Sequence, residues 1–526
     1  MKPTRRAPEP HRSPHTERGT TKDLVHFMLY HSTRNPQEVL TSREAVLKGL
    51  AQDGGLFVTD LLGERRIDPT SLTGPYADTA KRVFSALLDD YTPEEIDQSI
   101  AAAYGSTFKC PLPGDVTPVT KLGRMHLLEL YHGPTAAFKD VALCMLPQLM
   151  SRALVGTGRR LMIVTATSGD TGKAALAGFE DVPGIGITVF YPEGGVSAVQ
   201  HLQMATQEGS NVAVCAVKGN FDDAQTAVKN LFSSPITKEL AQIGVSLSSA
   251  NSINIGRLVP QIVYYFDAYR QLLARGVVHA GDPVDFTVPT GNFGDVLAGW
   301  CAKRMGLPVR RLVVASNANN VLTDFLLTGV YDRRRPLHKT ISPSMDILVS
   351  SNLERALYWI DDMSAERTRE RMESLKTKGF YQVDAELLAK LQATFGCGFA
   401  DDAATMDSIR AAWEEDGRLI DPHTAVARRV ALENASPEVP MVVLSTASPY
   451  KFCRDVYTAL YGDLKTKAAA PEAAAFEYMD ALADATGVEP PASLSNLRTK
   501  PVLWKDVEAI ADLPQYVLRQ ARTKLA

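Results

Sequence analysis

Between residue 117 and about residue 318, the chain alternates short, continuous apolar segments with longer segments of helical periodicity. The apolar segments are rich in β-branched residues and lie at 161–166, 185–191, 212–217, 284–288 and 312–316. Helical patterns separate them, for example at 171–179, 198–207, 221–231 and 257–273. Continuous apolar strands that alternate with helices are typical of a parallel sheet covered on both faces. We therefore expect an α/β protein whose ligands lie beyond the carboxyl ends of its strands.

The segment before this alternating region has a different character. Residues 1–24 contain many Arg, Pro, Thr and His residues and almost no apolar ones, so we expect a disordered tail. Residues 25–115 hold helical patterns at 76–88 and 93–104, and the second begins with Thr92 as N-cap and a proline in the first turn. These patterns predict a small helical N-terminal domain.

The remaining chain is predicted to form a core and a C-terminal segment. Residues 116–465 should form the core, with a polar helical insertion at about 330–436 and a last strand at 439–447. Residues 466–526 contain short helical patterns and predict a C-terminal helical segment.

The composition is that of an ordinary globular protein. The chain has 526 residues, of which 45% are hydrophobic and 22% charged, and it is too long for a single core. The net charge of −4 gives no reason to expect a nucleic-acid or membrane partner, and no apolar run is long enough to span a bilayer. The six cysteines show no CxxC pair, so we expect reduced thiols in a cytoplasmic protein and no metal site. We expect a monomer or a homodimer.

One lysine lies in an apolar setting. Lys139 stands between Phe138 and Asp140, shortly after a turn formed by Gly133 and Pro134. Lysine is seldom buried without a partner, and an amine held in such a setting has a lowered pKa and reacts as a nucleophile with aldehydes. A surface lysine at the start of a helix explains this segment equally well when the segment is taken alone.

The loop at 167–172, TSGDTG, follows a predicted strand and precedes a predicted helix. Unsatisfied N–H groups at a helix N-terminus attract anions, and the hydroxyls of Ser168 and Thr171 add donors. The alternative is a plain capped helix with Ser168 or Asp170 as the N-cap. Capping alone does not require two glycines and two hydroxyls, so we favour a site for a small carboxylate or phosphate.

The loop at 289–295, PTGNFGD, occupies the same kind of position after the strand at 284–288. Its glycines let backbone amides approach a ligand closely, which again suggests a phosphate. The loop lacks the GK[ST] of a Walker motif and does not read GxGxxG. Two anion loops and one buried lysine suit a phosphorylated aldehyde, and pyridoxal phosphate (PLP) is the cofactor of that kind.

Two further positions could contact such a ligand. Arg257 lies in the first turn of a predicted helix, where a cation opposes the helix dipole and an anionic ligand would explain it. The alternative is a surface arginine with a remote carboxylate partner. Thr446 ends the last strand, where its hydroxyl could hydrogen-bond a neutral ring nitrogen, although an ordinary strand-end threonine explains the residue as well.

Several longer motifs occur together and in order along the chain. They read LKGLAQDGGLFV, ELYHGPTAAFKD, TATSGDTGKAA, NSINIGR, VPTGNFGDVLAG, SPSMDILVSSNLERAL and STASPYKF. With these motifs the chain resembles threonine synthase, a fold-type II PLP enzyme, in the longer form of bacteria and fungi, from about residue 30 to the C-terminus. The resemblance implies a tryptophan synthase β-like fold with two parallel-sheet lobes, helices on both faces of each sheet, and a small helical N-terminal domain.

The resemblance also implies roles for individual residues. Lys139 would bind the cofactor covalently and move protons. The cofactor would further contact Asp170, Gly291, Asn292, Phe293, Gly294, Asp295 and Thr446. The substrate carboxylate would be held by Ser168, Gly169 and Thr171, and Asn254 and Arg257 are the candidates for the substrate phosphate.

The implied reaction converts O-phospho-L-homoserine and water to L-threonine and phosphate by γ-elimination and β-addition, the last step of threonine biosynthesis. Such an enzyme is a carbon–oxygen lyase that acts on phosphates. Two alternatives stay open. One is a phospho-amino-acid lyase on the same scaffold, which would give 2-oxobutyrate. The other is a PLP-binding regulatory protein without turnover.

Overall fold

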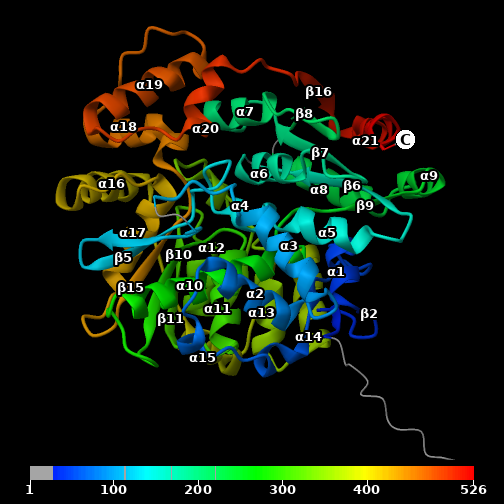
Figure 1. The fold of residues 1–526 in the computed structure, drawn as a ribbon, viewed down its shortest axis with the longest axis horizontal. Coiled ribbons are helices and arrows are strands. Elements are labelled where there is room, and N and C mark those ends of the chain that lie inside the picture. Colours follow the sequence, from blue (N-terminus) through cyan, green and yellow to red (C-terminus); the bar gives the residue numbers. More distant parts are fainter. Residues whose placement is uncertain (1–27, 112–113, 168, 220, 526) are drawn as a thin grey trace, which may run out of the picture.

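A computed structural model describes residues 28–111, 114–167, 169–219 and 221–525 of the chain. Two sheets form the centre of the molecule, one of five strands and one of six (Figure 1). The predicted tail at 1–24 lies outside the described residues. The structure therefore has the parallel strands that the alternating pattern predicted, arranged in the two lobes that the resemblance implied.

The five-stranded sheet has the order β16-β8-β7-β6-β9, and all of its strands are parallel. Its strands are β6 (Arg160–Ala166), β7 (Ile185–Pro192), β8 (Val212–Lys218), β9 (Val245–Ser248) and β16 (Asp506–Ala509). Leu161 and Ile163 share a core with α6 (Asp170–Phe179), whereas Met162 and Val164 share one with helices on the opposite face. Those helices are α8 (Phe221–Leu231), α9 (Ile236–Gln242) and α21 (Leu513–Lys524). Burial of both faces explains why the central strands β6, β7 and β8 are almost continuously apolar.

The six-stranded sheet has the order β14-β11-β10-β15-β5-β4, and only the β4–β5 pair is antiparallel. Its strands are β4 (Val119–Leu122), β5 (Met125–Glu129), β10 (Val284–Pro289), β11 (Val309–Ser316), β14 (Phe395–Phe399) and β15 (Met441–Ser445). Leu312 and Val314 face α10 (Ile255–Ala274) and α11 (Gly294–Arg304). Val313 and Ala315 share the opposite core with α17 (Pro422–Asn434), so this sheet is also covered on both faces.

The N-terminal part combines three helices with a small sheet. The helices are α1 (Ser42–Lys48), α2 (Tyr76–Leu87) and α3 (Pro93–Tyr104), and α3 has Thr92 in a capping box at its N-terminus. The sheet is antiparallel, with the order β2-β1-β3, and consists of β1 (Tyr30–Ser32), β2 (Val39–Leu40) and β3 (Phe57–Val58). Helix α2 packs on α10, which joins this part to the six-stranded lobe.

The polar region at 330–436 is more than a helical insertion. It contains α13 (Leu353–Ile360), α14 (Ala365–Thr377), α15 (Ala385–Thr394) and α16 (Asp402–Asp416), but also β12 (Val330–Asp332), β13 (Phe380–Gln382) and β14. Strand β14 forms an edge of the six-stranded sheet, and its sequence, FGCGF, carries two glycines that weaken the strand signal.

The C-terminal segment likewise contains a strand besides its helices. The helices there are α19 (Pro471–Thr486), α20 (Ala492–Ser495) and α21, and α19 lies beside α18 (Cys453–Tyr461) at the top of Figure 1. Strand β16 pairs with β8 as an edge of the five-stranded sheet, and its sequence, DVEA, is too polar to show a buried strand. The predicted domain boundaries, after residue 115 and after residue 465, stay predictions.

Two further observations concern composition. All six cysteines are free thiols. Among the helices in the described ranges, none is both long and apolar enough to cross a membrane.

Candidate active site

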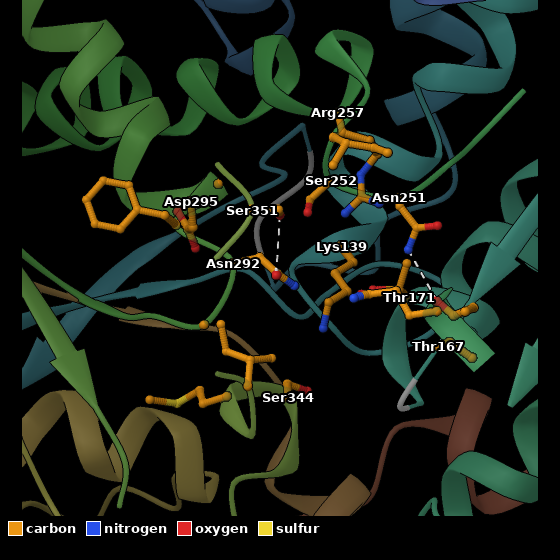
Figure 2. Close-up of a pocket in the computed structure, with 18 of the residues that line it drawn as sticks. Lys139, Thr167, Thr171, Asn251, Ser252, Arg257, Asn292, Asp295, Ser344 and Ser351 are labelled. Carbon is orange, nitrogen blue, oxygen red and sulfur yellow. Dashed lines mark hydrogen bonds between the residues drawn. The ribbon is translucent and has the colours of Figure 1, made fainter. Parts of the chain in front are cut away.

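A cavity lies where the carboxyl ends of strands from both sheets meet. Residues from β6 and the loop after it, from the loop after β10, and from the end of β15 line it. Further lining residues come from α4 (Lys139–Leu143), α8, the start of α10, the segment 344–351, α17 and the N-terminal part of the chain, which contributes Leu50. Figure 2 shows Lys139 between Arg257, Asn251 and Ser252 on one side and Ser344 on the other.

Lys139 is the first residue of α4, and the segment before it is fixed to the end of β15. The backbone N–H of Phe138 donates to the carbonyl of Thr446 at 2.8 Å, and Ala136 adopts a left-handed conformation with φ 58°. The Lys139 side chain is 13% exposed. Burial lowers its pKa, Asp170 opposes this change, and the charges of Lys451 and Arg257 reinforce it. Lys139 is therefore a strong candidate for a neutral, reactive amine.

The loop after β6 is held by Thr167, whose hydroxyl oxygen accepts from the backbone N–H groups of Gly169 and Gly172, both at 2.9 Å. Gly169 occupies the N-cap position of α6 with φ 137°, where a Cβ would collide with Gln200. The helix has no side-chain cap, so Asp170 is not an N-cap. Thr171 lines the cavity, whereas Ser168 lies outside the described residues.

Asp170 is buried, and polar groups of four other side chains lie within 3.6 Å of its carboxylate oxygens. Its Oδ1 lies 2.7 Å from Lys451 Nζ and 2.9 Å from Gln200 Nε2. Its Oδ2 accepts from Ser344 Oγ at 3.2 Å and lies 3.6 Å from Lys139 Nζ. Burial alone would raise the pKa of Asp170, but the charges of Lys451 and Lys139 hold it far below its ordinary range. Asp170 is therefore an ionised carboxylate.

The loop after β10 leads into α11 through a left-handed residue. Phe293 has φ 61° and stands at the N-cap position, again without a side-chain cap. A Cβ on Gly291 would lie 2.9 Å from the carbonyl oxygen of Ser344, so the loop admits only glycine there without a shift. The residues 290–295 all line the cavity. Uncapped N–H groups at a helix N-terminus beside a cavity form an anion site.

Asp295, in the first turn of α11, holds its proton to a much higher pH than an ordinary aspartate. Burial raises its pKa to about 7, although the hydroxyls of Tyr264 and Tyr265 donate to Oδ1 at 2.5 and 3.0 Å. Its Oδ2 is buried and has no hydrogen-bond partner among the described residues. The carboxyl group is thus partly protonated near neutral pH and has one oxygen left for a ligand.

Arg257 lies at the start of α10 and is 2% exposed. Its Nη1 donates to the carbonyl of Ala250 at 2.6 Å, and its buried Nε has no partner within the described ranges. Burial lowers its pKa to about 10. In the described part of the chain no carboxylate forms an ion pair with Arg257. A buried cation without a counter-charge is costly, and an anionic ligand in the cavity would remove that cost.

Asn254 does not reach the cavity. It is fully buried as the N-cap of α10, where its Oδ1 accepts from the N–H of Gly256 at 2.9 Å. Its Nδ2 donates to the carbonyls of Val46 at 2.9 Å and Ser249 at 3.1 Å. The structure thus joins Asn254 to the N-terminal part of the chain and leaves it no free polar atom for a substrate.

Some residues that sequence reasoning missed complete the site. His423 lines the cavity, with Nδ1 2.7 Å from Asp421 Oδ1 and Nε2 accepting from the Ser344 N–H at 3.2 Å. Lys451 forms an ion pair with Asp170 but does not itself line the cavity. Lys451 belongs to the motif STASPYKF and could have been suspected there, whereas no local pattern singles out His423. Thr446 lines the cavity as expected for a contact with a ligand.

These residues fit PLP. A buried amine is available for its aldehyde, and the uncapped N-terminus of α11 with Gly291 offers a cradle that a side chain would fill. The orphan atoms Arg257 Nε and Asp295 Oδ2 show that the cavity holds polar groups which the described residues do not satisfy.

Comparisons with known proteins agree with this fit. The family model described as pyridoxal-phosphate dependent enzyme matches residues 113–447. Two further models, threonine synthase N terminus and threonine synthase C-terminal, match residues 29–104 and 424–484.

Similar whole proteins give the same result. Threonine synthase-like 1 of Homo sapiens is 40% identical over 435 residues, which are 79% of this chain and 58% of that protein, so the chain spans little more than half of that relative. Threonine synthase of Pseudomonas aeruginosa is 39% identical, over 81% of this chain and 89% of that protein.

Two solved structures are similar throughout. PLP-bound threonine synthase from Brucella melitensis has a TM-score of 0.81 and 36% identity, and covers 94% of this chain and 100% of its own. Threonine synthase from yeast also has a TM-score of 0.81, with 31% identity, and covers 95% of this chain and 99% of its own. The fold and the site thus define a PLP-dependent enzyme of fold type II, and the predicted fold class and cofactor are confirmed. Within that class, the chain belongs to the threonine synthase family.

Proposed function

We propose that this protein converts O-phospho-L-homoserine and water to L-threonine and inorganic phosphate. The observation that carries the proposal is the pairing of two anion sites around one amine. The uncapped N-terminus of α11 suits the cofactor phosphate, and Arg257, a buried cation without an internal counter-charge, suits the phosphate of the substrate. A substrate with its own phosphate would use both.

The residues of the chain divide the work as follows. PLP, when bound, withdraws electrons from the substrate carbon next to the amino group. Lys139 Nζ, with its lowered pKa, removes one proton each from the α- and β-carbons, and protons return to the γ-carbon after the phosphate has left and to the α-carbon at the end. Arg257 holds the phosphate and stabilises its charge as the bond from the γ-carbon to oxygen breaks. Water supplies the hydroxyl group that adds to the β-carbon.

The other predicted contacts remain part of the proposal. Gly291, Asn292, Phe293 and Gly294 would hold the cofactor phosphate, with Asp295 beside it. Thr171, with Ser168 and Gly169, would bind the substrate carboxylate, Asp170 would approach the phenolic oxygen of the cofactor, and Thr446 would face its ring nitrogen. Asn254 supports the Arg257 segment instead of binding the substrate, because its polar atoms are all engaged.

We also propose that the protein works in the cytoplasm as a monomer or a homodimer, with a small-molecule substrate and without a nucleic-acid or membrane partner. The six free thiols support the compartment, and the net charge of −4 supports the absence of a polyanionic partner.

Product analysis tests the proposed reaction. Purified protein with PLP and phosphohomoserine should release threonine and phosphate in equal amounts. Formation of 2-oxobutyrate in place of threonine would identify a lyase, and the absence of any phosphate release would identify a non-catalytic PLP-binding protein. Either result would overturn the proposal.

A further inference from the structure

A second lysine is buried behind the reactive one. Lys451 lies in the short 3₁₀ helix η4 (Pro449–Phe452) that follows β15, and its side chain is 0% exposed. Its Nζ lies 2.7 Å from Asp170 Oδ1 and donates to the carbonyl of Thr135 at 3.0 Å. Lys451 does not line the cavity. A fully buried lysine is rare, and this one cannot touch a substrate, so its contact with Asp170 is the part of its surroundings that needs an explanation.

Asp170 is shared unequally by the two lysines. Lys451 Nζ is 2.7 Å from one carboxylate oxygen, whereas Lys139 Nζ is 3.6 Å from the other. Gln200 Nε2 and Ser344 Oγ donate to the same two oxygens and fix the orientation of the carboxylate. Two amines therefore compete for one carboxylate, and the shorter contact belongs to the lysine that does not line the cavity.

The other charged or titratable groups around Lys139 either favour its neutral form or form no ion pair with it. Arg257, from α10, adds a second positive charge near the amine. Asp295, from α11, is only partly ionised near neutral pH because burial raises its pKa to about 7. His423, from α17, has both ring nitrogens engaged by Asp421 and the Ser344 N–H. On α4 itself, Asp140 is bound by the N–H and the hydroxyl of Thr135. Asp170 is thus the one ionised carboxylate in contact with Lys139 among the described residues.

We propose that Lys451 is a positioning residue that neutralises Asp170 inside the protein and thereby leaves Lys139 as a free amine. With Lys451 in place, Asp170 can stand next to Lys139 without holding a proton on it. Without the charge of Lys451, Asp170 would form its ion pair with Lys139, and the ammonium form would be favoured. The inference rests on the part of the proposed function that makes Lys139 the reactive amine, and it does not depend on which product is formed.

The test is the titration of Lys139 in the full-length protein after removal of PLP. Trace acetylation with acetic anhydride over a range of pH, read by mass spectrometry of the Lys139 peptide, reports the fraction of neutral amine, with the exposed Lys505 as internal reference. In Lys451→Met the midpoint should rise by about one to three pH units, because an uncompensated carboxylate at this distance shifts a pKa by that amount. Acetylation of Lys139 at neutral pH should then fall by about tenfold or more.

Three variants make the result specific. Lys451→Arg keeps the charge and should keep the midpoint near that of the wild type. Lys173→Met removes another lysine near Asp170, on α6, that bonds Gln207 and not Asp170, and should leave the midpoint unchanged. If Lys451→Met does not fold, Lys451→Gln retains a donor to Asp170 without the charge and should give the same upward shift.

An unchanged Lys139 midpoint in both neutral Lys451 variants would overturn the inference, as would an equal shift in Lys173→Met. The outcome is independent of the product assay. A protein without threonine synthase activity could still show the shift, and an active enzyme could still lack it.

Discussion

Arg257 of α10 and Arg355 of α13 are both buried arginines without a carboxylate partner among the described residues, yet they are held in different ways. Arg355 donates to the carbonyls of Phe57 at 3.0 Å and Ile253 at 2.6 Å and to Asn352 Oδ1 at 2.5 Å. Arg257 donates to one carbonyl, and its Nε has no partner. Arg257 lines the cavity, whereas Arg355 does not.

The difference separates a structural cation from one that is available to a ligand. Arg355 spreads its charge over three acceptors and joins β3 of the N-terminal part to the segment before α10. Arg257 keeps hydrogen-bonding capacity that the protein does not use. Burial lowers the pKa of each to about 10, so burial and pKa alone do not tell them apart. The two arginines differ in the donors that remain free, because the Nε of Arg257 has no acceptor among the described residues.

We expect the largest effect from removal of the Lys139 amine, because both proposed roles of the two arginines presuppose that the cavity is an active site. Lys139→Ala should lower kcat/KM by at least about 10⁴-fold, because it removes both covalent capture and the proton carrier. The protein should also lose the absorbance of bound cofactor above 400 nm, while Lys173→Ala keeps it. Activity retained in Lys139→Ala would show that the chemistry lies elsewhere.

Arg257→Ala tests the functional half of the comparison. We expect kcat/KM for phosphohomoserine to fall by about 10²–10³-fold, mainly through KM, since the phosphate loses its charged partner. The cofactor absorbance should not change. The melting temperature should stay the same or rise, because the variant removes a buried charge without a counter-ion. Unaltered kcat and KM would remove Arg257 from the substrate site.

Arg355→Ala tests the structural half. Truncation leaves three buried acceptors without donors and should cost about 3 kcal/mol of unfolding free energy. Denaturant unfolding measures this loss. The folded fraction should show a smaller change in kcat/KM than Arg257→Ala shows. If Arg355→Ala were stable and Arg257→Ala unfolded, the two roles would have to be exchanged.

We expect the smallest effect on stability from Asp295. If this residue were ionised, it would place a negative charge in the cavity that Arg257 shares. Its folded pKa of about 7 lies above its ordinary value of 3.8, so the group stabilises the fold at low pH and this contribution is lost as the pH rises toward 7. Between pH 5.5 and 7 the loss should be about 2 kcal/mol. Asp295→Asn should lack this part of the pH dependence, as unfolding curves at the two pH values would show. An identical pH dependence in wild type and variant would mean that Asp295 is ionised throughout.

The fold was predictable where burial acts on a whole segment. Strands β6, β7, β10 and β11 are almost entirely buried, so their sequences are largely apolar, and the helices between them bury apolar residues against the sheets. Strands β14 and β16 escaped prediction because they are edge strands, one with two glycines and the other with polar residues. Their place is decided by pairing with β11 and β8, which no local pattern encodes.

The candidate site was predictable where chemistry is concentrated in a short motif. Lys139 and the loops before α6 and α11 each carry their own signal, and the structure brings them to one cavity. Asp170 and Lys451 lie 281 positions apart in the sequence (451 − 170), so only the fold reveals that they form an ion pair. Asn254 was placed at the substrate because it lies in the same motif as Arg257, but its side chain points into the protein as a helix cap.

The most direct test is borohydride reduction of the protein with bound PLP, followed by mass mapping of the labelled peptide. The account predicts a single pyridoxyl group on the peptide that contains Lys139. A label on Lys451 or Lys173, or an unlabelled Lys139, would contradict it.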